Sequence, residues 1–394
     1  MKNKKPVALT LAAVFLLFLP LLLTACGGGQ QAVPDTTPAP VESAETAPDA
    51  PSGGVLMEDA TYYSFGSPIR RAQILSVTFL SDTSQAPAES WDVSQAQDGS
   101  VIAWTVENGE LYDLFIASDG GVIAPENCQL MFQFYTKLES IAFNSAFDTS
   151  HVTSMNRMFQ NCERLTELDL SGFDTSHVTD MELMFNECKS LTRLDVSGFD
   201  TSNVTTMGGM FYFCENLPTL DVSGFDTSNV TDMGWMFCVC ANLTALDVSG
   251  FDTSNVTRMD HMFSSCPSLA TLDVSGFDTS NVTNMEYMFS ECKSLTELDV
   301  NGFDTSNVTT LWMMFYYCHN LTTLDVSNFN TSNVKSMREM FRECSSLTEL
   351  DVSGFDTSNV TTIEYMFQDC PAVTAEDISG WDLSNATDAD KIFG

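Results

Sequence analysis

Cysteine is the first residue type in this 394-residue chain whose chemistry and spacing need an explanation. Nine of the twelve cysteines recur at one constant interval: Cys162, Cys188, Cys214, Cys240, Cys266, Cys292, Cys318, Cys344 and Cys370. In a stacked repeat, neighbouring cysteines of this row would have Cα atoms within disulfide range. Nine is an odd number, however, no histidine occupies the cysteine position of the repeat, and buried cysteine behaves as a small apolar residue. We therefore expect a row of buried thiols, and the states of Cys128 and Cys238, outside the row, stay open.

Two rows of aspartates follow the same spacing and could bind a cation. One row directly follows a recurring aromatic residue, and Asn330 replaces Asp in one copy, which favours a turn role because both side chains accept from nearby backbone N–H groups. Carboxylates stacked about 4.8 Å apart repel by about 1 kcal/mol per pair in water, and Ca²⁺ takes several oxygen ligands. Water, salt and neighbouring Ser and Thr side chains are the alternative, and no other cofactor is indicated. The candidate calcium ligands, in the second row, are Asp195, Asp221, Asp247, Asp273, Asp299, Asp325 and Asp351.

Signs of catalysis are missing from the sequence. His151 and His177 occupy a turn position that Asn holds in later copies, and His261 and His319 fall at variable outer positions. The sequence contains no His-Glu-x-x-His, Gly-x-Ser-x-Gly or phosphate-loop motif. We therefore expect no enzymatic activity. The alternative is an enzyme carried by residues 55–136, although that stretch has no histidine.

One repeated segment positions these side chains, and residues 275–283, Ser-Gly-Phe-Asp-Thr-Ser-Asn-Val-Thr, are typical of it. It returns at the same interval as the cysteines, without insertion or deletion, and Trp381 replaces the phenylalanine in the tenth copy. The other copies have Phe147, Phe173, Phe199, Phe225, Phe251, Phe277, Phe303, Phe329 and Phe355. Such self-similarity predicts a solenoid, in which each unit buries its apolar side against its neighbours.

Within one unit the apolar positions predict a short helix and a short strand. Met285, Met288, Phe289 and Cys292 have the i, i+3, i+4, i+7 spacing of one helical face. Leu298 and Val300 alternate with Asp299, as in a strand. Gly276 precedes the phenylalanine, where Asn328 stands in one copy, and both residue types tolerate a positive φ. We therefore expect a left-handed turn at this position.

Aromatic residues also occupy positions that the core does not require. If the helical face above points inward, the second, fifth and sixth residues after Met285 and their equivalents point outward. The candidate binding face is Tyr212, Phe213, Trp235, Tyr287, Tyr316, Tyr317 and Tyr365, with Trp312 at its edge. Exposed aromatic residues on an acidic protein are typical of protein interfaces. The alternative is that these rings lean on the next coil and only tile the surface.

The N-terminal third predicts an anchor, a linker and a cap. Residues 1–25 have the lysines, apolar run and small residues of a signal peptide, and Cys26 follows as in a bacterial lipobox, where the thiol is lipidated. Residues 26–54 predict a flexible linker, because they contain no Lys, Arg or aromatic residue. Residues 55–136 predict a β-rich cap, with a hairpin around Asn108-Gly109. The solenoid of about ten repeats is assigned to 137–394, with a degenerate repeat before the first copy and a truncated last one.

The repeat resembles a known family of surface proteins. Leu295-Thr-Glu-Leu298-Asp-Val300 fits the strand of leucine-rich repeats, and with Met288-Phe289-Ser-Glu-Cys292 it resembles the BspA-like leucine-rich-repeat proteins, including the 26-residue repeats of mycoplasma lipoproteins. The resemblance implies adhesion to host cells, matrix proteins or other bacteria, and no catalytic residues. The phenylalanine row replaces the asparagine row of ordinary leucine-rich repeats, so their curvature does not carry over.

These features together predict a membrane-anchored, extracytoplasmic lipoprotein on a bacterial surface. Removal of residues 1–25 would take away three of the 16 basic residues and none of the 53 acidic ones, so the net charge would change from −37 to −40. This charge argues against nucleic acid and anionic membranes as partners. We expect adhesion to host or bacterial surface proteins or glycans, with membrane contact through the lipid only. A calcium-stiffened structural stalk is the alternative.

Overall fold

The computed structural model describes residues 53–56, 65–67 and 69–394, all within one unit of the chain, Pro51–Gly394. The predicted signal peptide 1–25, the lipidation site Cys26 and nearly all of the linker 26–54 lie outside the described residues. Within the described part, no helix is both long enough and apolar enough to cross a bilayer.

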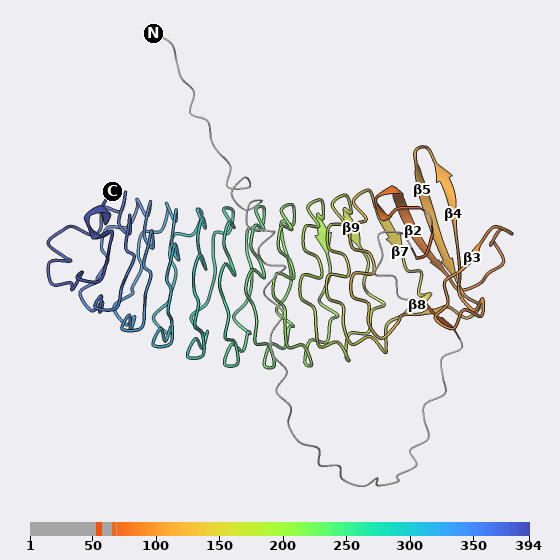
Figure 1. Ribbon diagram of the computed structural model, residues 1–394, viewed down its shortest axis with the longest axis horizontal. Helices are drawn as coiled ribbons and strands as arrows, with labels where there is room; N and C mark the ends of the chain where they lie inside the picture. Colours follow the sequence, from red (N-terminus) through yellow and green to blue (C-terminus); the bar gives the residue numbers. More distant parts are fainter. Residues whose placement is uncertain (1–52, 57–64, 68) are drawn as a thin grey trace, which may run out of the picture. The chain divides into compact units, whose positions relative to one another are not determined.

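The predicted N-terminal strands are present and form a five-stranded sheet (Figure 1). Its order is β3 (Trp91–Asp92), β4 (Ile102–Asn108), β5 (Leu111–Ala117), β2 (Ile74–Leu80) and β7 (Ser140–Ala142). Strands β4 and β5 form the expected antiparallel hairpin, in which Gly109 has a φ of 67°. Strand β2 pairs in parallel with both β5 and β7.

Pairing between units begins before residue 137. Three short parallel strands, β1 (Gly54–Val55), β6 (Val122–Ile123) and β8 (Phe147–Asp148), lie side by side. Cys128 then donates its N–H to the carbonyl of Ser154, at 2.9 Å. The degenerate repeat therefore includes residues 122–136, which the sequence had placed in the cap.

Arg71, in the short 3₁₀ helix η2 (Arg71–Gln73), closes the edge of this first unit. Its side chain is buried and donates to the carbonyls of Leu130, at 2.6 Å, and Gln133, at 3.2 Å. In the following unit the carbonyl of Gln160, which corresponds to Gln133, accepts the N–H of Phe134 at 2.9 Å. Arg71 therefore supplies the donor that a preceding unit would otherwise provide.

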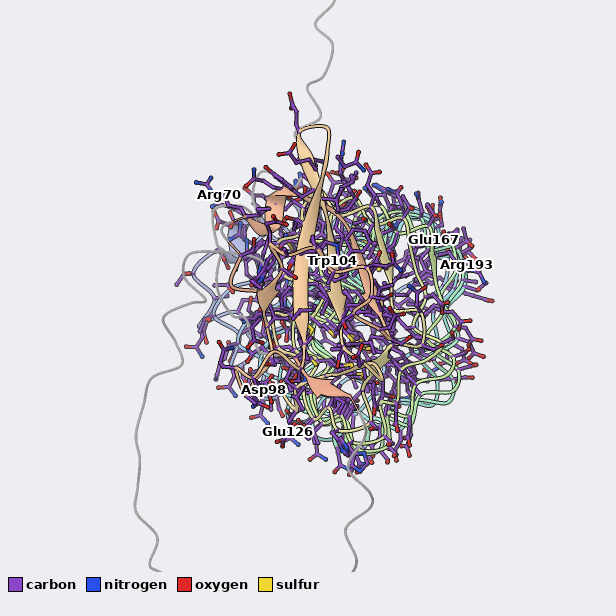
Figure 2. All side chains as sticks on the ribbon, turned by 90° about the vertical axis from the view of Figure 1, so that its right-hand side faces the viewer. Arg70, Asp98, Trp104, Glu126, Glu167 and Arg193 are labelled. Carbon is purple, nitrogen blue, oxygen red and sulfur yellow. The ribbon has the colours of Figure 1, made fainter. Side chains whose placement is uncertain are left out.

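From Phe147 onward the repeat pattern is regular, with few helices (Figure 1). Strands β9 (Glu167–Leu168) and β10 (Arg193–Leu194) pair in parallel, and single parallel bridges such as Asn284↔Thr310 continue the register. Glu167 and its neighbour Arg193 lie together on the outer side of the units (Figure 2). The chain ends after the 3₁₀ helix η3 (Ala389–Lys391).

The apolar side of each unit is buried as predicted, but its helix is replaced by a series of turns. Met285, Met288, Phe289 and Cys292 are fully buried. Met288 and Cys292 donate their N–H groups three residues back, whereas Phe289 donates to the carbonyl of Met314 in the next unit, at 3.0 Å. An α-helix would use nearly all its N–H groups internally and would leave none to join the units.

Two residues per unit in the left-handed region make this arrangement possible. In the unit of Phe277 they are Tyr287 and Glu291, each with a φ of 58°. Tyr287 and Glu291 both donate to the next unit, at 2.9 and 2.7 Å. The left-handed turn predicted at Gly276 is wrong, because Gly276 and its equivalents have φ values outside that region.

The core between units consists of identical side chains in contact. The ring of Phe289 stacks on those of Phe263 and Phe315, with centroids 5.8 and 5.7 Å away. Phe277 is only 3% exposed. Leu298 and Val300 are buried on either side of exposed Asp299, as predicted, although bridges such as Glu297↔Thr323 replace a longer strand.

Candidate binding face

The predicted outward aromatic residues lie in one strip of surface, which we call the aromatic band. They stand at the ninth, tenth, thirteenth and fourteenth positions after the recurring phenylalanine, and all eight are partly buried. The tenth and fourteenth positions are the ones with positive φ, for example 64° at Trp235 and 59° at Tyr317. The same backbone that joins the units therefore presents these side chains at the surface.

The N-terminal half of the band is a continuous row of rings. Tyr212 meets Trp235 edge-on, with centroids 5.3 Å apart. His261 stacks between Trp235 and Tyr287, with centroids 3.7 and 4.4 Å away and interplanar angles of 11° and 12°. Tyr287 then contacts Trp312 at 5.1 Å. Five successive units thus contribute one ring each.

His261 is the member that the sequence analysis missed. It was grouped with variable outer residues, yet it stands exactly one repeat after Trp235 and one repeat before Tyr287. That spacing was the available signal. Its side chain is buried, with 5% exposed, so it links the rings on either side rather than facing solvent.

The C-terminal half of the band alternates rings with cations. Tyr316 and Tyr317 contact each other at 4.3 Å. The guanidinium of Arg342 lies over Tyr316 and Tyr365, at 5.7 and 5.5 Å from the ring centroids, and that of Arg338 lies over Trp312 at 5.9 Å. Glu339 joins the two arginines, accepting from Arg338 Nε at 3.0 Å and from Arg342 at 2.7 Å. The band therefore continues without a break from Phe213 to Tyr365.

A charge network lies under the middle of the band. Arg258 contacts both carboxylate oxygens of Asp260, at 2.7 and 3.0 Å, and also donates to Asp232 at 3.2 Å. The indole of Trp235 donates to Asp260 at 2.9 Å. A Cβ at Gly234 would lie 3.2 Å from an oxygen of Asp232 and of Asp260. Glycine at this position therefore leaves room for the network.

Asp260, His261 and Glu286 are the one group among the described residues whose ligand atoms could surround a metal ion. Arg258 already provides a cation at Asp260, and a metal ion would have to compete with this guanidinium. Burial raises the pKa of Asp260, but the hydrogen bond with His261 and the charge of Arg258 outweigh it and hold the pKa below its ordinary value. Burial lowers the pKa of His261 and raises that of Glu286. This group fits an internal ion-pair network better than a metal site.

The candidate calcium ligands each close a turn in their own unit. Asp273 accepts the N–H and the hydroxyl of Ser275, at 3.0 and 2.7 Å, and Asp299 accepts the N–H of Asn301 at 3.0 Å. These serine hydrogen bonds lower the pKa of Asp273 below its ordinary value. Calcium binding by this row stays a prediction. The equivalent bonds are made by Asp195, Asp221, Asp247, Asp325 and Asp351.

The cysteine row is buried, as predicted, and its thiols have a role that the sequence did not indicate. Cys292 donates from Sγ to the carbonyl of Phe263 in the preceding unit, at 3.1 Å, and Cys266 does so to Phe237 at 3.0 Å. Burial raises the pKa of Cys266 to about 12. Cys128 and Cys238 are also buried.

Two cavities lie among the N-terminal strands. One has a volume of about 550 Å³, with Asp98 and Asp119 in its lining, and the other about 570 Å³, with Glu89, Trp91 and Asp92. Among their described lining residues neither has a histidine, a cysteine or a lysine. The described lining of these cavities therefore offers carboxylates, but neither an imidazole nor a thiol.

Comparison with known proteins identifies the repeats. A family model described as "Mycoplasma protein of unknown function, DUF285" matches residues 126–237, 213–298 and 294–394. Neither the curated proteins nor the solved structures include a match to the chain. The three matches together span more than half of the sequence. The chain therefore belongs to the DUF285 family of mycoplasma proteins of unknown function.

Proposed function

We propose that this protein is a lipid-anchored bacterial surface protein whose aromatic band binds macromolecules on host or microbial surfaces. The anchor would be Cys26, behind the signal peptide 1–25. Residues 55–121 would act as a β-rich cap on the repeats, outside the cytoplasm. No enzymatic activity is expected, and the lipid would be the sole contact with the membrane.

One observation carries the proposal: the band gathers large aromatic side chains at positions that vary between the repeat units. The core positions are nearly the same in every unit, and the aspartate and serine turns recur likewise. The band instead contains Trp235, Tyr287, Trp312 and Tyr317 in different units, and cationic side chains lie over the last two. Tyr, Trp and Arg are the residues enriched at the energetic centres of protein interfaces.

The packing of the rings favours preorganised binding. Each ring rests on a ring or a cationic side chain of a neighbouring unit, so it tiles the surface, as the alternative interpretation expected. The rings nevertheless keep part of their surface exposed. Side chains that are already immobilised lose little conformational entropy on binding. Tiling and binding are therefore compatible roles.

We also propose that the repeats form a solenoid of the leucine-rich-repeat kind, related to the BspA-like surface proteins. Parallel bridges between equivalent residues of adjacent units, and the hydrogen bonds that join successive units, support the solenoid. The Leu295, Leu298 and Val300 pattern supports the leucine-rich-repeat likeness. Turns in place of the helix are a departure from that kind of unit.

Binding of the soluble chain 27–394 to intact cells and to immobilised matrix proteins tests the proposal. The double variant Trp312→Ser with Tyr317→Ser should lose most binding while its melting temperature stays within a few degrees. Glu297→Ser with Thr323→Ser, on exposed positions outside the band, is the matched control and should bind normally. Unchanged binding by the first variant would remove the band from the function.

A further inference from the structure

The repeat unit that begins at Phe329 contains an unusual number of basic residues. It contains Lys335, Arg338 and Arg342, three of the 16 basic residues of a chain with a formal net charge of −37. Arg338 and Arg342 belong to the aromatic band. They lie next to the unit of Phe303, whose band residues Trp312, Tyr316 and Tyr317 are uncharged.

The rings hold both guanidinium groups in place. Arg342 lies between Tyr316 and Tyr365, 5.7 and 5.5 Å from their centroids, and Arg338 lies over Trp312 at 5.9 Å. A guanidinium offers five N–H donors in a planar fork that matches a carboxylate. Stacking on rings restricts the rotation of this fork, so it is oriented before any ligand arrives.

The chain's own carboxylates accept from only part of the N–H donors of these two arginines. Arg338 and Arg342 share Glu339, whose side chain is only 3% exposed. Glu364 is shared between Arg338, at 3.6 Å, and Lys391, at 2.9 Å. Glu339 thus serves both arginines, whereas Glu364 lies closer to Lys391 than to Arg338, and Asp390 also acts on Lys391. The side chains of Arg338 and Arg342 are 42% and 25% exposed, so a ligand can reach them.

We propose that Arg338 and Arg342 form a carboxylate-binding site, which takes an Asp or Glu side chain of a partner protein. This inference rests on the proposed binding function and names the chemistry of the partner. Two guanidinium groups that share one buried carboxylate, on an otherwise acidic protein, give an acidic side chain one favourable place to dock. Arg–carboxylate pairs with two parallel hydrogen bonds are both strong and directional.

The arrangement of the rings favours a protein over a glycan or a nucleic acid. Stacking of a sugar or a base requires a free ring face. In the band the faces of Trp235, His261 and Tyr287 cover one another, and Arg338 covers a face of Trp312. The exposed parts of the rings suit apolar side chains next to an acidic one. The net charge of the chain repels nucleic acid.

Fluorescence anisotropy with labelled tetraglutamate, at low ionic strength because salt screens such contacts, tests the site directly. The chain 27–394 should bind tetraglutamate and should not bind tetraglutamine. Arg338→Gln with Arg342→Gln should weaken tetraglutamate binding at least tenfold. Arg193→Gln, a cation outside the band, is the matched control and should bind as the unchanged chain does. No binding by the unchanged chain, or equal binding by the double variant, would overturn the inference.

Two further measurements separate the possible causes. If the double variant melts much lower, Arg338→Lys with Arg342→Lys keeps the charge but not the fork, and it should still lose several-fold in affinity. A sialylated oligosaccharide that binds more tightly than tetraglutamate would overturn the assignment to a protein partner. If the unchanged chain binds tetraglutamate but no cell or matrix protein, the proposed function fails while the carboxylate site stands.

Discussion

The thiol of Cys292 donates a hydrogen bond to the carbonyl of Phe263, in the preceding repeat unit, at 3.1 Å. The same contact recurs along the row, for example from Cys318 to Phe289 at 3.2 Å. Cysteine here is both a small apolar side chain and a donor to a buried backbone carbonyl. Eight of the nine cysteines in the row, Cys162 to Cys344, make this contact, which favours cysteine over alanine or valine at the position.

Cys292→Ala should therefore lower the free energy of unfolding, because it removes both a buried sulfur atom and a hydrogen-bond donor. The carbonyl of Phe263 would lose a donor, which costs roughly 1–3 kcal/mol for a buried group. Cys292→Ser, which keeps a donor, should cost less. Urea unfolding of both variants measures the difference. Equal costs for Ala and Ser would contradict the role of the hydrogen bond.

Two glycines should respond in opposite directions to the same substitution. Gly276 lies outside the left-handed region, and a Cβ there would be 3.9 Å from the carbonyl oxygen of Ser249, so Gly276→Ala should stabilise by about 0.4–1 kcal/mol. Gly209 has a φ of 60°, and a Cβ there would lie 2.5 Å from Cδ2 of Leu183, so Gly209→Ala should destabilise by about 1–2 kcal/mol or more. Thermal unfolding of the two variants and of the unchanged chain measures both effects. If Gly276→Ala lost stability, the backbone at this position would require glycine, contrary to our prediction.

Stability should fall on mild acidification because of His261. Burial lowers its pKa in the folded protein below the ordinary value of 6.5, against the opposing effect of Asp260, while Arg258 adds to the lowering. Below pH 6.5 the unfolded chain therefore takes up a proton that the folded chain does not, so stability decreases as the pH falls from about 7 toward the lower folded pKa.

Replacement of His261 isolates this contribution. His261→Phe keeps a ring between Trp235 and Tyr287 and removes the titration, so its free energy of unfolding should change less between pH 7 and pH 5.5. Glu286 and Asp232 stay in place in both proteins, while Asp260 loses its hydrogen bond with His261 and keeps that with Arg258, and the reduced pH dependence therefore reports on the His261–Asp260 pair. Identical pH dependence of the two proteins would show that His261 does not titrate in this range.

Calcium should have little effect on stability if the aspartate turns account for the second row. Asp273 satisfies Ser275 within one unit, at 3.0 and 2.7 Å, and this local contact does not need a metal ion. We expect the same melting temperature in EDTA and in millimolar Ca²⁺. We also expect Asp273→Asn to be nearly neutral, because Asn330 makes the same contacts with Ser332 in the other row. A clear rise in melting temperature with Ca²⁺ would instead support the calcium-stiffened stalk.

The sequence by itself determined which side chains are buried and how often they return. Identical residues one repeat apart, such as Phe263 and Phe289, can all be buried only if each unit packs on the next, so the spacing alone predicts the repeat. Alternation at Leu298 and Val300 and the Asn108-Gly109 hairpin are likewise local signals. The outward aromatic positions followed from the same reasoning. Once the inward-facing positions of each unit were assigned to the core, the remaining aromatic residues had to lie outside it.

Only the tertiary structure decided the backbone between these positions. The spacing of Met285, Met288, Phe289 and Cys292 suits a helix and a series of turns equally well, since both place these side chains on one side. The choice depends on whether the N–H of Phe289 bonds within its own segment or to Met314 in the next unit. The same holds for the thiol of Cys292, the edge-closing role of Arg71 and the place of His261 between two rings. Each depends on a partner in another unit or another strand, and no local pattern in the sequence records such a contact.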